Sequence, residues 1–332
     1  MLLLFIIFLS IIIGLLVVFG ILFIIAGLWA KNKIKKLKSE SEIAKTSEGK
    51  IEYVVLGEGT PLLIFHGAPG GYDQGFLMEN FVENGFQVIA FSRPGYLRTP
   101  LNGHRSYNQQ AKLAASLLDH LQISECVIVG LSAGGPVALR FVLQYPSKVI
   151  SIILMSAVTK KYIPSDYQSN SLLGKIYLSN LGGVLIGYFM SLSLRKWPKR
   201  VLKSFLKLET TFPKETINEL TKEISKDPDQ MNWFKHLVET TIPLSARKEG
   251  LKNDIQILSE LETLPLGYIE KTILIVHSKN DADVEFSHAQ NIMERSKNTE
   301  FYESHGLGHL VWLGLDRKQM YEKVFNFIRK YN

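Results

Sequence analysis

The first thirty residues constrain the fold of this chain more than any other segment. From Leu2 to Ala30 no side chain is charged, and Leu, Ile, Phe and Val predominate. A helix of this length measures roughly 43 Å at 1.5 Å per residue, which exceeds the ~30 Å hydrocarbon core of a bilayer. The segment can therefore cross a membrane with some tilt, and we predict a transmembrane anchor at residues 1–30.

A cleavable signal peptide is the alternative interpretation of this segment. Signal peptides begin with a basic region, carry a shorter apolar run and end in small residues before the cleavage site. Here the run is longer and no charged side chain precedes it, although the small residues Ala26, Gly27 and Ala30 leave cleavage open. We expect the segment to be retained as an anchor.

The positive charge of the chain is concentrated directly after this run. The net charge is +7, and five lysines lie between Lys31 and Lys38 with no acidic residue among them. The positive-inside rule predicts that residues 31 onward lie in the cytoplasm. Because the excess is local, it argues against a nucleic-acid partner. Residues 31–48 are rich in Lys, Ser and Glu, and we expect a basic juxtamembrane linker there.

Residues 49–332 alternate between strand-like and helix-like patterns. Stretches with an apolar period near 3.6 are typical of helices, and short aliphatic runs are typical of strands. Their alternation predicts a mostly parallel sheet with helices on both faces. The helical stretches lie at 106–121, 134–145 and 316–331, and the strand-like runs at 51–56, 61–65, 86–91, 126–131, 149–155, 272–277 and, more weakly, 299–303.

One interval, about 158–268, interrupts this alternation. It has helical character, contains six prolines and is too long for a simple crossover, so we predict an inserted helical lid. Within it, residues 176–194 carry no charge. Their glycines, serines and asparagine favour buried lid helices over a second membrane span.

The most informative motif is GLSAG at residues 130–134. It follows the strand-like run CVIVGL and precedes the helical stretch GGPVALRFVLQY. In this context the small flanking residues permit a tight turn that exposes the hydroxyl of Ser132. The amides at the start of the following helix would favour negative charge beside it. We predict that Ser132 is a nucleophile; an ordinary glycine-rich turn is the alternative.

A serine nucleophile needs a base and an acid that orients the base. In this arrangement the acid and then the histidine follow the serine along the chain. Asp281 comes just after the strand-like run TILIVHS, and His309 lies in a glycine-rich loop before the C-terminal helix. We predict these two residues as the acid and the base. Asp283 could replace the first and His305 the second, because spacing alone does not fix the direction of a side chain.

A glycine-rich loop, HGAPGG at residues 66–71, follows another strand-like run. Such a loop can aim backbone N–H groups at an oxyanion. We expect the two donors to be the amides of Ala68 and Ala133. We expect His66 to hold the loop by hydrogen bonds rather than to act in catalysis. Structural or solvent-facing roles are expected for His277, His288 and Asp254.

Several of these motifs together resemble the α/β-hydrolase superfamily, over roughly residues 50–331. They are HGAPGG, FSRPGYLRTP, GLSAGG, the D-x-x-V at 281–284 and the closing GLGH. The first two are similar to those of proline-iminopeptidase-like and esterase-like members. The resemblance implies an eight-stranded, mostly parallel sheet, a lid after the sixth strand and a triad of Ser132, Asp281 and His309. Serine at the elbow departs from the haloalkane dehalogenases and epoxide hydrolases, which carry aspartate there.

These observations lead to the hypothesis of a membrane-anchored serine hydrolase. It would cleave a carboxylic ester through an acyl-enzyme on Ser132, with His309 as base and Asp281 fixing its tautomer. No metal or organic cofactor is required, and the small-molecule ester or amide substrate could be lipophilic. The alternatives are an amidase or aminopeptidase of the proline-iminopeptidase type, and a non-catalytic binding protein on the same fold.

Two features of the predicted lid bear on the substrate. Proline iminopeptidases hold a substrate amine with acidic lid residues, and four acidic residues here have a spacing that suits a solvated face equally well: Glu209, Glu215, Glu219 and Glu223. A basic cluster beside Trp197 is typical of a helix at an anionic headgroup layer, but a solvated basic face is the simpler interpretation. That cluster consists of Arg195, Lys196, Lys199, Arg200 and Lys203.

Overall fold

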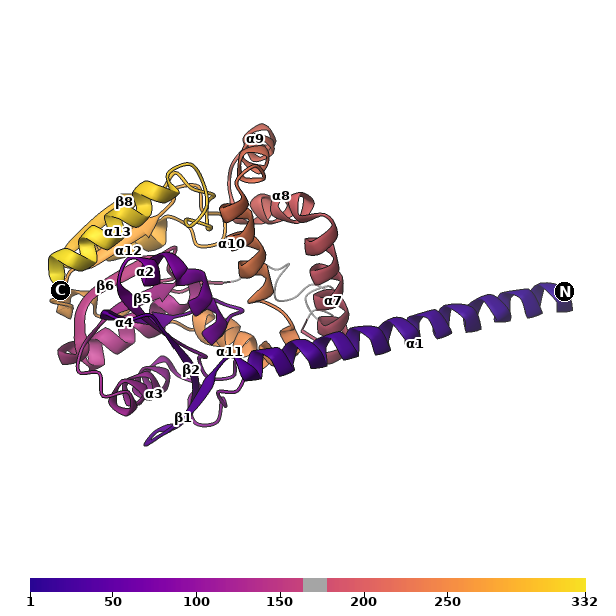
Figure 1. Ribbon diagram of the computed structural model, residues 1–332, viewed down its shortest axis with the longest axis horizontal. Helices are drawn as coiled ribbons and strands as arrows, with labels where there is room; N and C mark the ends of the chain where they lie inside the picture. The colour runs from indigo at the N-terminus through magenta and orange to yellow at the C-terminus, as the bar shows by residue number, and fades with distance from the viewer. Residues whose placement is uncertain (164–177) are drawn as a thin grey trace.

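A central eight-stranded sheet organises the computed structural model, which describes residues 1–163 and 178–332 (Figure 1). The strand order is β1-β2-β4-β3-β5-β6-β7-β8. The pairs β1–β2 and β2–β4 are antiparallel and the remaining pairs are parallel, which confirms the mostly parallel sheet. The strands are β1 (Glu42–Thr46), β2 (Gly49–Leu56), β3 (Thr60–Phe65), β4 (Phe86–Phe91), β5 (Cys126–Leu131), β6 (Val149–Met155), β7 (Ile273–His277) and β8 (Thr299–Glu303).

Helices cover both faces of the sheet, as the alternating pattern predicts. Buried side chains of α3, α4 and α12 share one hydrophobic cluster with the sheet, and those of α2 and α13 share a second cluster on the other face. The central strands β3, β5 and β6 are apolar along nearly their whole length because both of their faces are covered. The helices are α2 (Glu79–Glu83), α3 (Tyr107–His120), α4 (Gly135–Gln144), α12 (Ser287–Arg295) and α13 (Arg317–Tyr331).

The lid lies between β6 and β7, where the sequence predicts an insertion after the sixth strand. Its buried side chains on α8 and α10 join the same cluster as α13, so the lid packs on the domain rather than standing apart. Part of the stretch 176–194 lies outside the described residues, and the described part is helical from Asn180. The lid helices are α7 (Asn180–Lys196), α8 (Pro198–Glu209), α9 (Lys214–Ile224), α10 (Pro228–Glu239) and α11 (Lys248–Ser259).

The segment expected to be a linker, residues 31–48, is instead ordered structure. The N-terminal helix α1 (Leu2–Ser39) continues through the lysines, and β1 then pairs with β2. The reason is tertiary: Leu37 is buried, its carbonyl accepts a hydrogen bond from the Tyr72 hydroxyl at 2.5 Å, and Arg98 binds the Ser41 carbonyl at 2.9 Å. These partners lie far along the chain, so composition alone could not reveal them.

Candidate active site

Ser132 lies at the sharp turn between β5 and α4. Its backbone has a φ of 46°, in the left-handed region that non-glycine residues rarely adopt. The turn packs closely on the end of β3, since a Cβ atom on Gly134 would collide with the Phe65 carbonyl there. A Cβ on Gly130 would lie 3.0 Å from the side chains of Ala138 and Leu154. The two glycines of the motif thus let α4 begin directly against the sheet.

Three predicted residues from distant parts of the chain meet at this turn. Ser132 Oγ lies 3.1 Å from His309 Nε2, and His309 Nδ1 lies 2.9 Å from Asp281 Oδ2. The other oxygen of Asp281 accepts hydrogen bonds from the backbone N–H groups of Asp283, at 3.0 Å, and Val284, at 2.8 Å. These bonds fix the carboxylate, which in turn orients the imidazole toward the serine.

The two alternative residues have other surroundings. Asp283 accepts a hydrogen bond from the Tyr162 hydroxyl at 2.6 Å, and its second oxygen lies 3.7 Å from His309 Nε2 rather than Nδ1. His305 has an exposed side chain, and its backbone N–H donates to Asp316. Neither residue completes a hydrogen-bonded chain to Ser132. The geometry therefore favours Asp281 and His309.

The glycine-rich loop lies against the turn that carries Ser132, since a Cβ on Gly67 would lie 3.2 Å from Ser132 Cβ. Ala68 lines the cavity in front of Ser132, and Ala133 directly follows the serine. Both amides are thus near the serine, and their role as oxyanion donors stays a prediction. Two buried side chains hold the loop: His66, which begins it, and Arg247, which comes from the lid.

His66 has the structural role expected of it. Its Nδ1 lies 2.7 Å from the Gly67 carbonyl and its Nε2 accepts from the Arg93 N–H at 2.9 Å. Burial, with the nearby Arg93 guanidinium, lowers the pKa of His66 well below its usual value, so the ring is neutral. The guanidinium of Arg247, from the lid, binds the Gly70 carbonyl at 2.7 Å and the Asp73 carboxylate at 2.6 Å.

The other three expected structural residues also hold backbone or buried partners. His277 Nε2 lies 2.8 Å from the Val284 carbonyl, and His288 accepts from the Thr159 N–H at 3.1 Å. Asp254 is buried and pairs with both terminal nitrogens of Arg93. These contacts tie α11 and the loop after β7 to the sheet.

A cavity of about 160 Å³ lies in front of Ser132. Its walls are mainly apolar, and the stacked rings of Trp233 and Trp312, with centroids 5.6 Å apart, form part of them. Among the described residues that line it, the ionisable groups are Glu209, Asp283 and His309, and no lysine or arginine is present. The site therefore suits a neutral or cationic substrate better than an anionic one.

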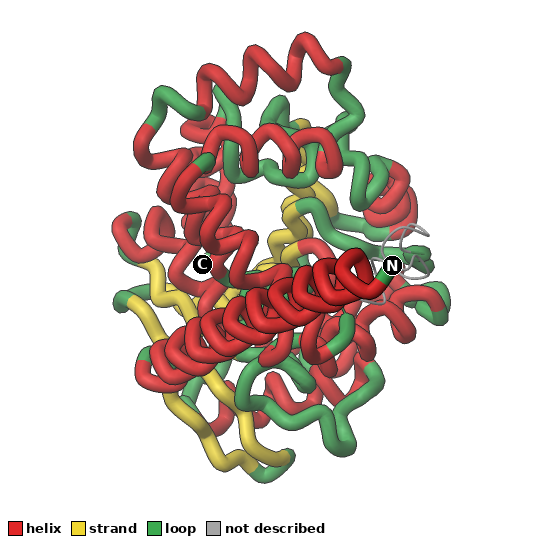
Figure 2. The backbone as a smooth tube through the Cα atoms, turned by 90° about the vertical axis from the view of Figure 1, so that its right-hand side faces the viewer, coloured by secondary structure: helices red, strands yellow, loops and turns green. Residues whose placement is uncertain are grey.

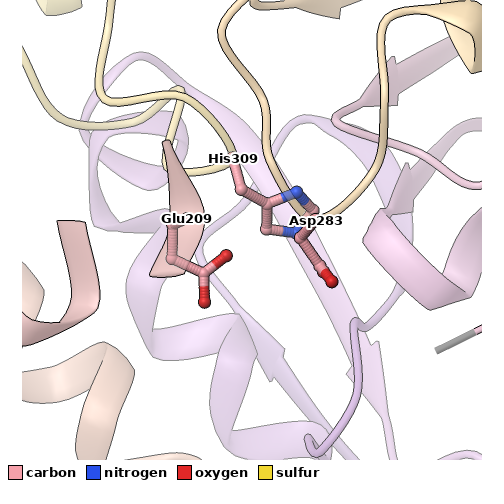
Figure 3. Close-up of side chains that lie close together, drawn as sticks. All are labelled: Glu209, Asp283 and His309. Carbon is pink, nitrogen blue, oxygen red and sulfur yellow. The ribbon is translucent and has the colours of Figure 1, made fainter. Parts of the chain in front are cut away.

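Glu209 is the site residue that sequence reasoning could not single out. It ends α8, and its backbone carbonyl accepts a hydrogen bond from the His309 N–H at 2.9 Å. Its Oε2 atom is buried and has no hydrogen-bond partner among the described residues, and its carboxyl group faces the site with Asp283 and His309 (Figure 3). Burial and the neighbouring carboxylates, partly offset by His309, raise the pKa of Glu209 to about 7. The other three lid glutamates are exposed on α9.

The same three residues offer ligand atoms that lie within 4.8 Å of one another, a spacing that could hold a cation. Nε2 of His309 already faces Ser132, however, and Nδ1 faces Asp281. A metal ion bound there would take the histidine away from the serine. We therefore interpret Glu209 and Asp283 as the electrostatic environment of His309.

Carboxylates around His309 set its protonation state. Burial lowers the pKa of this imidazole, but Asp281, together with Asp283 and Glu209, outweighs burial and raises the pKa to about 10. A base must be neutral to accept a proton, so activity that depends on His309 should rise with pH toward that value.

We expect Glu209→Gln to shift the acidic limb of the kcat/KM profile to lower pH, by roughly one unit. The reason is that a neutral amide no longer stabilises the imidazolium, so His309 becomes neutral at lower pH. The measurement is the pH dependence of p-nitrophenyl acetate hydrolysis. Glu215→Gln, on the exposed face of α9, is the matched control and should leave the limb in place. An unmoved limb in Glu209→Gln would show that this carboxyl does not act on the base.

Comparisons with known proteins agree with this architecture. A sequence profile described as "alpha/beta hydrolase fold" matches residues 60–184. An uncharacterized hydrolase, YcgS of Bacillus subtilis, is 29% identical over 296 residues, covering 88% of this chain and 99% of that protein. A 2-hydroxy-6-oxo-6-phenylhexa-2,4-dienoate hydrolase of Comamonas testosteroni is 23% identical and covers 87% of this chain and 96% of its own.

Among solved structures, an alpha/beta hydrolase fold protein from Nakamurella multipartita superposes with a TM-score of 0.79 at 26% identity. The match covers 87% of this chain and 99% of that one. An esterase from Exiguobacterium antarcticum shares the fold, with a TM-score of 0.59 at 18% identity, over 87% and 98% of the two chains. The chain has the α/β-hydrolase fold that its motifs predict, and its matches lie in that superfamily. The relatives also support the broad class of hydrolase.

Proposed function

We propose that this protein is a serine hydrolase that cleaves a carboxylic ester. The observation that carries the proposal is the hydrogen-bonded chain from Ser132 through His309 to Asp281. In the first half of the reaction, His309 Nε2 takes the proton of Ser132 as Oγ attacks the ester carbonyl carbon. The tetrahedral oxyanion is stabilised by the amides of Ala68 and Ala133. His309 then protonates the departing alcohol, which leaves an acyl group on Ser132.

Water completes the cycle by the same steps. His309 removes a proton from water as the water oxygen attacks the acyl carbon, and the proton returns to Ser132 Oγ when the acid leaves. Asp281 keeps the imidazole in the tautomer that presents Nε2 to the serine, and it stabilises the imidazolium formed in each half. No metal or organic cofactor takes part in this scheme.

The cavity supports an uncharged ester as the substrate. Its walls are largely apolar, and two carboxyl groups, those of Glu209 and Asp283, face it without a lysine or arginine among the described lining residues. A substrate that carries a carboxylate, such as the dienoate in the name of the Comamonas relative, would lack a cationic partner there. The same two carboxyl groups favour an aminopeptidase as the second candidate, because they could pair with a substrate amine.

A substrate panel separates these candidates. It contains p-nitrophenyl acetate, butyrate and octanoate, an aminoacyl p-nitroanilide, and a 2-hydroxy-6-oxohexadienoate. We expect kcat/KM for the esters to exceed that for the anilide and the dienoate by at least about tenfold, which corresponds to ~1.4 kcal/mol. Faster cleavage of the anilide would instead establish the aminopeptidase.

We also propose that α1 anchors the enzyme in a membrane with the catalytic domain on the cytoplasmic side. The helix is long and apolar enough to cross a bilayer, and its most apolar stretch is not buried in the protein. The lysines that follow the apolar run favour retention of that end in the cytoplasm. Figure 1 displays α1 projecting from the domain with the N-terminus at its far end.

A further inference from the structure

The lid helix α7 packs directly on the base of the anchor helix α1. The rings of Trp29 and Tyr188 meet edge to face with centroids 6.0 Å apart. Close approach depends on a small residue, because a Cβ on Gly187 would lie 3.2 Å from the Trp29 ring. On the α1 side, Ala26 and Ala30 are buried. Small residues of this kind allow two helices to pack closely.

The exposure of α1 divides it into two parts. Every residue from Leu2 to Ile21 is exposed, whereas the buried positions begin at Ala26. The exposed part contains 20 residues, and at 1.5 Å each it is about 30 Å long, the thickness of a bilayer hydrocarbon core. If this part fills the core, the stretch that contacts α7 lies at the headgroup layer. Figure 1 shows α7 running across α1 on the side of the domain from which α1 leaves, and Figure 2 views that side.

The outer surface of α7 is apolar and its end is basic. Leu181 and Phe189, two helical turns apart on one face, are 62% and 47% exposed, while Gly183 and Leu194 are buried. Trp197, at the junction with α8, is 50% exposed and lies beside the Arg200 guanidinium. The sequence from 178 to 208 contains no acidic residue. The exposed cations of this surface are Arg195, Lys196, Lys199 and Arg200.

We propose that α7 and the first turn of α8, residues 180–200, form a surface that lies on the anionic membrane crossed by α1. The apolar face enters the interface, Trp197 sits at the headgroup level, and the cations pair with lipid phosphates. This surface is continuous with the anchor, which identifies the bilayer as its partner. The basic cluster lies beside exposed apolar side chains, at the position along α1 where the headgroup layer is expected. A membrane-bound surface accounts for both features, whereas a solvated face accounts for the charges alone.

This surface also defines a substrate class, an inference that rests on the proposed function. The helix that follows it, α8, contributes Phe205 and Glu209 to the cavity wall in front of Ser132. A membrane-bound α7 therefore places that wall next to the lipid. The substrate is then an ester that partitions into the bilayer, and its acyl chain would occupy the apolar cavity.

The contact is tested on the full chain in vesicles of zwitterionic and anionic phospholipid. Phe189→Cys is labelled with the environment-sensitive fluorophore NBD; Cys126 is buried and should not label. Tyr268→Cys is the matched control, because this residue is 82% exposed. It precedes the start of β7, whereas the active site lies beyond the other end of that strand. We expect a blue shift and quenching by spin-labelled lipid at position 189 but not at 268. Equal behaviour of the two positions would overturn the proposal.

Charge reversal tests the role of the cations. In the double variant Arg195→Glu and Lys199→Glu, α1 still holds the protein in the vesicle, so the loss of quenching at position 189 reports the surface alone. We expect that loss in anionic vesicles. The labelled protein that keeps Arg195 and Lys199 should show the same loss at high salt. Unchanged quenching would refute the electrostatic part of the proposal.

Turnover by the same double variant tests the substrate class. We expect hydrolysis of p-nitrophenyl palmitate in vesicles to fall several-fold while hydrolysis of soluble p-nitrophenyl acetate stays constant. Equal losses for both esters would overturn the inference that the substrate reaches the cavity from the membrane. If the wild type cleaves neither ester, the proposed function fails, whereas the fluorescence measurement still decides the membrane surface.

Discussion

Ser132→Ala is expected to lower ester turnover by about four to six orders of magnitude while the protein keeps its fold. Loss of Oγ removes the atom that forms the acyl-enzyme, and binding together with the oxyanion amides leaves only residual catalysis. Turnover of p-nitrophenyl butyrate measures the effect, and circular dichroism with a thermal melt checks the fold.

The matched control for this variant is Ser204→Ala on α8. Its hydroxyl donates to the Arg200 carbonyl and it is exposed, so it should retain wild-type turnover. Near-normal turnover by Ser132→Ala would remove the basis of the proposed mechanism.

A comparable loss is expected for the two residues that activate the serine. Asp281→Asn should lower kcat by about 10⁴, because an amide favours the wrong tautomer of the imidazole, and His309→Ala should cost at least as much. The chain provides a close control for each. Asp283→Asn and His305→Ala should retain most activity, since neither residue lies in the hydrogen-bonded chain to Ser132. If the losses are exchanged within either pair, the role of that residue is misassigned.

The residues predicted for the centre of the site meet in the fold because local chemistry dictates where each of them lies. The elbow needs small residues around Ser132, and its strand-to-helix context is continuous in sequence. The acid and the base both follow strand-like runs, and the carboxyl ends of parallel strands meet at one edge of the sheet. Choosing between Asp281 and Asp283 required side-chain directions, which only the folded loop after β7 provides.

The parts that could not be predicted depend on contacts between distant segments. Glu209 was one of four lid glutamates with similar helical spacing, and only the packing of α8 against the loop of His309 distinguishes it. The ion pair of Arg247 and Asp73, which holds the glycine-rich loop from the lid, joins residues 174 positions apart. No periodicity or motif in the sequence records such a contact.

The end of the N-terminal helix also depends on contacts between distant segments. Its length and lack of charge indicate a membrane span from sequence alone. The sequence does not reveal that Ala26 and Ala30 are buried or that the helix continues to Ser39. The contacts of α1 come from distant residues: Trp29 packs on Tyr188 of α7, and the Leu37 carbonyl accepts a hydrogen bond from Tyr72. The order in the segment predicted as a linker has this origin: lysines favour solvent, but Leu37 between them is buried.

The central claim is that Ser132 forms a covalent intermediate. Its most direct test is mass spectrometry of the wild-type protein after reaction with a fluorophosphonate, followed by proteolysis and peptide mapping. We predict one adduct per chain, on the peptide that contains Ser132, and no adduct when His309 is replaced by alanine. An unmodified Ser132 peptide in active enzyme, or an adduct on a different residue, would contradict the account.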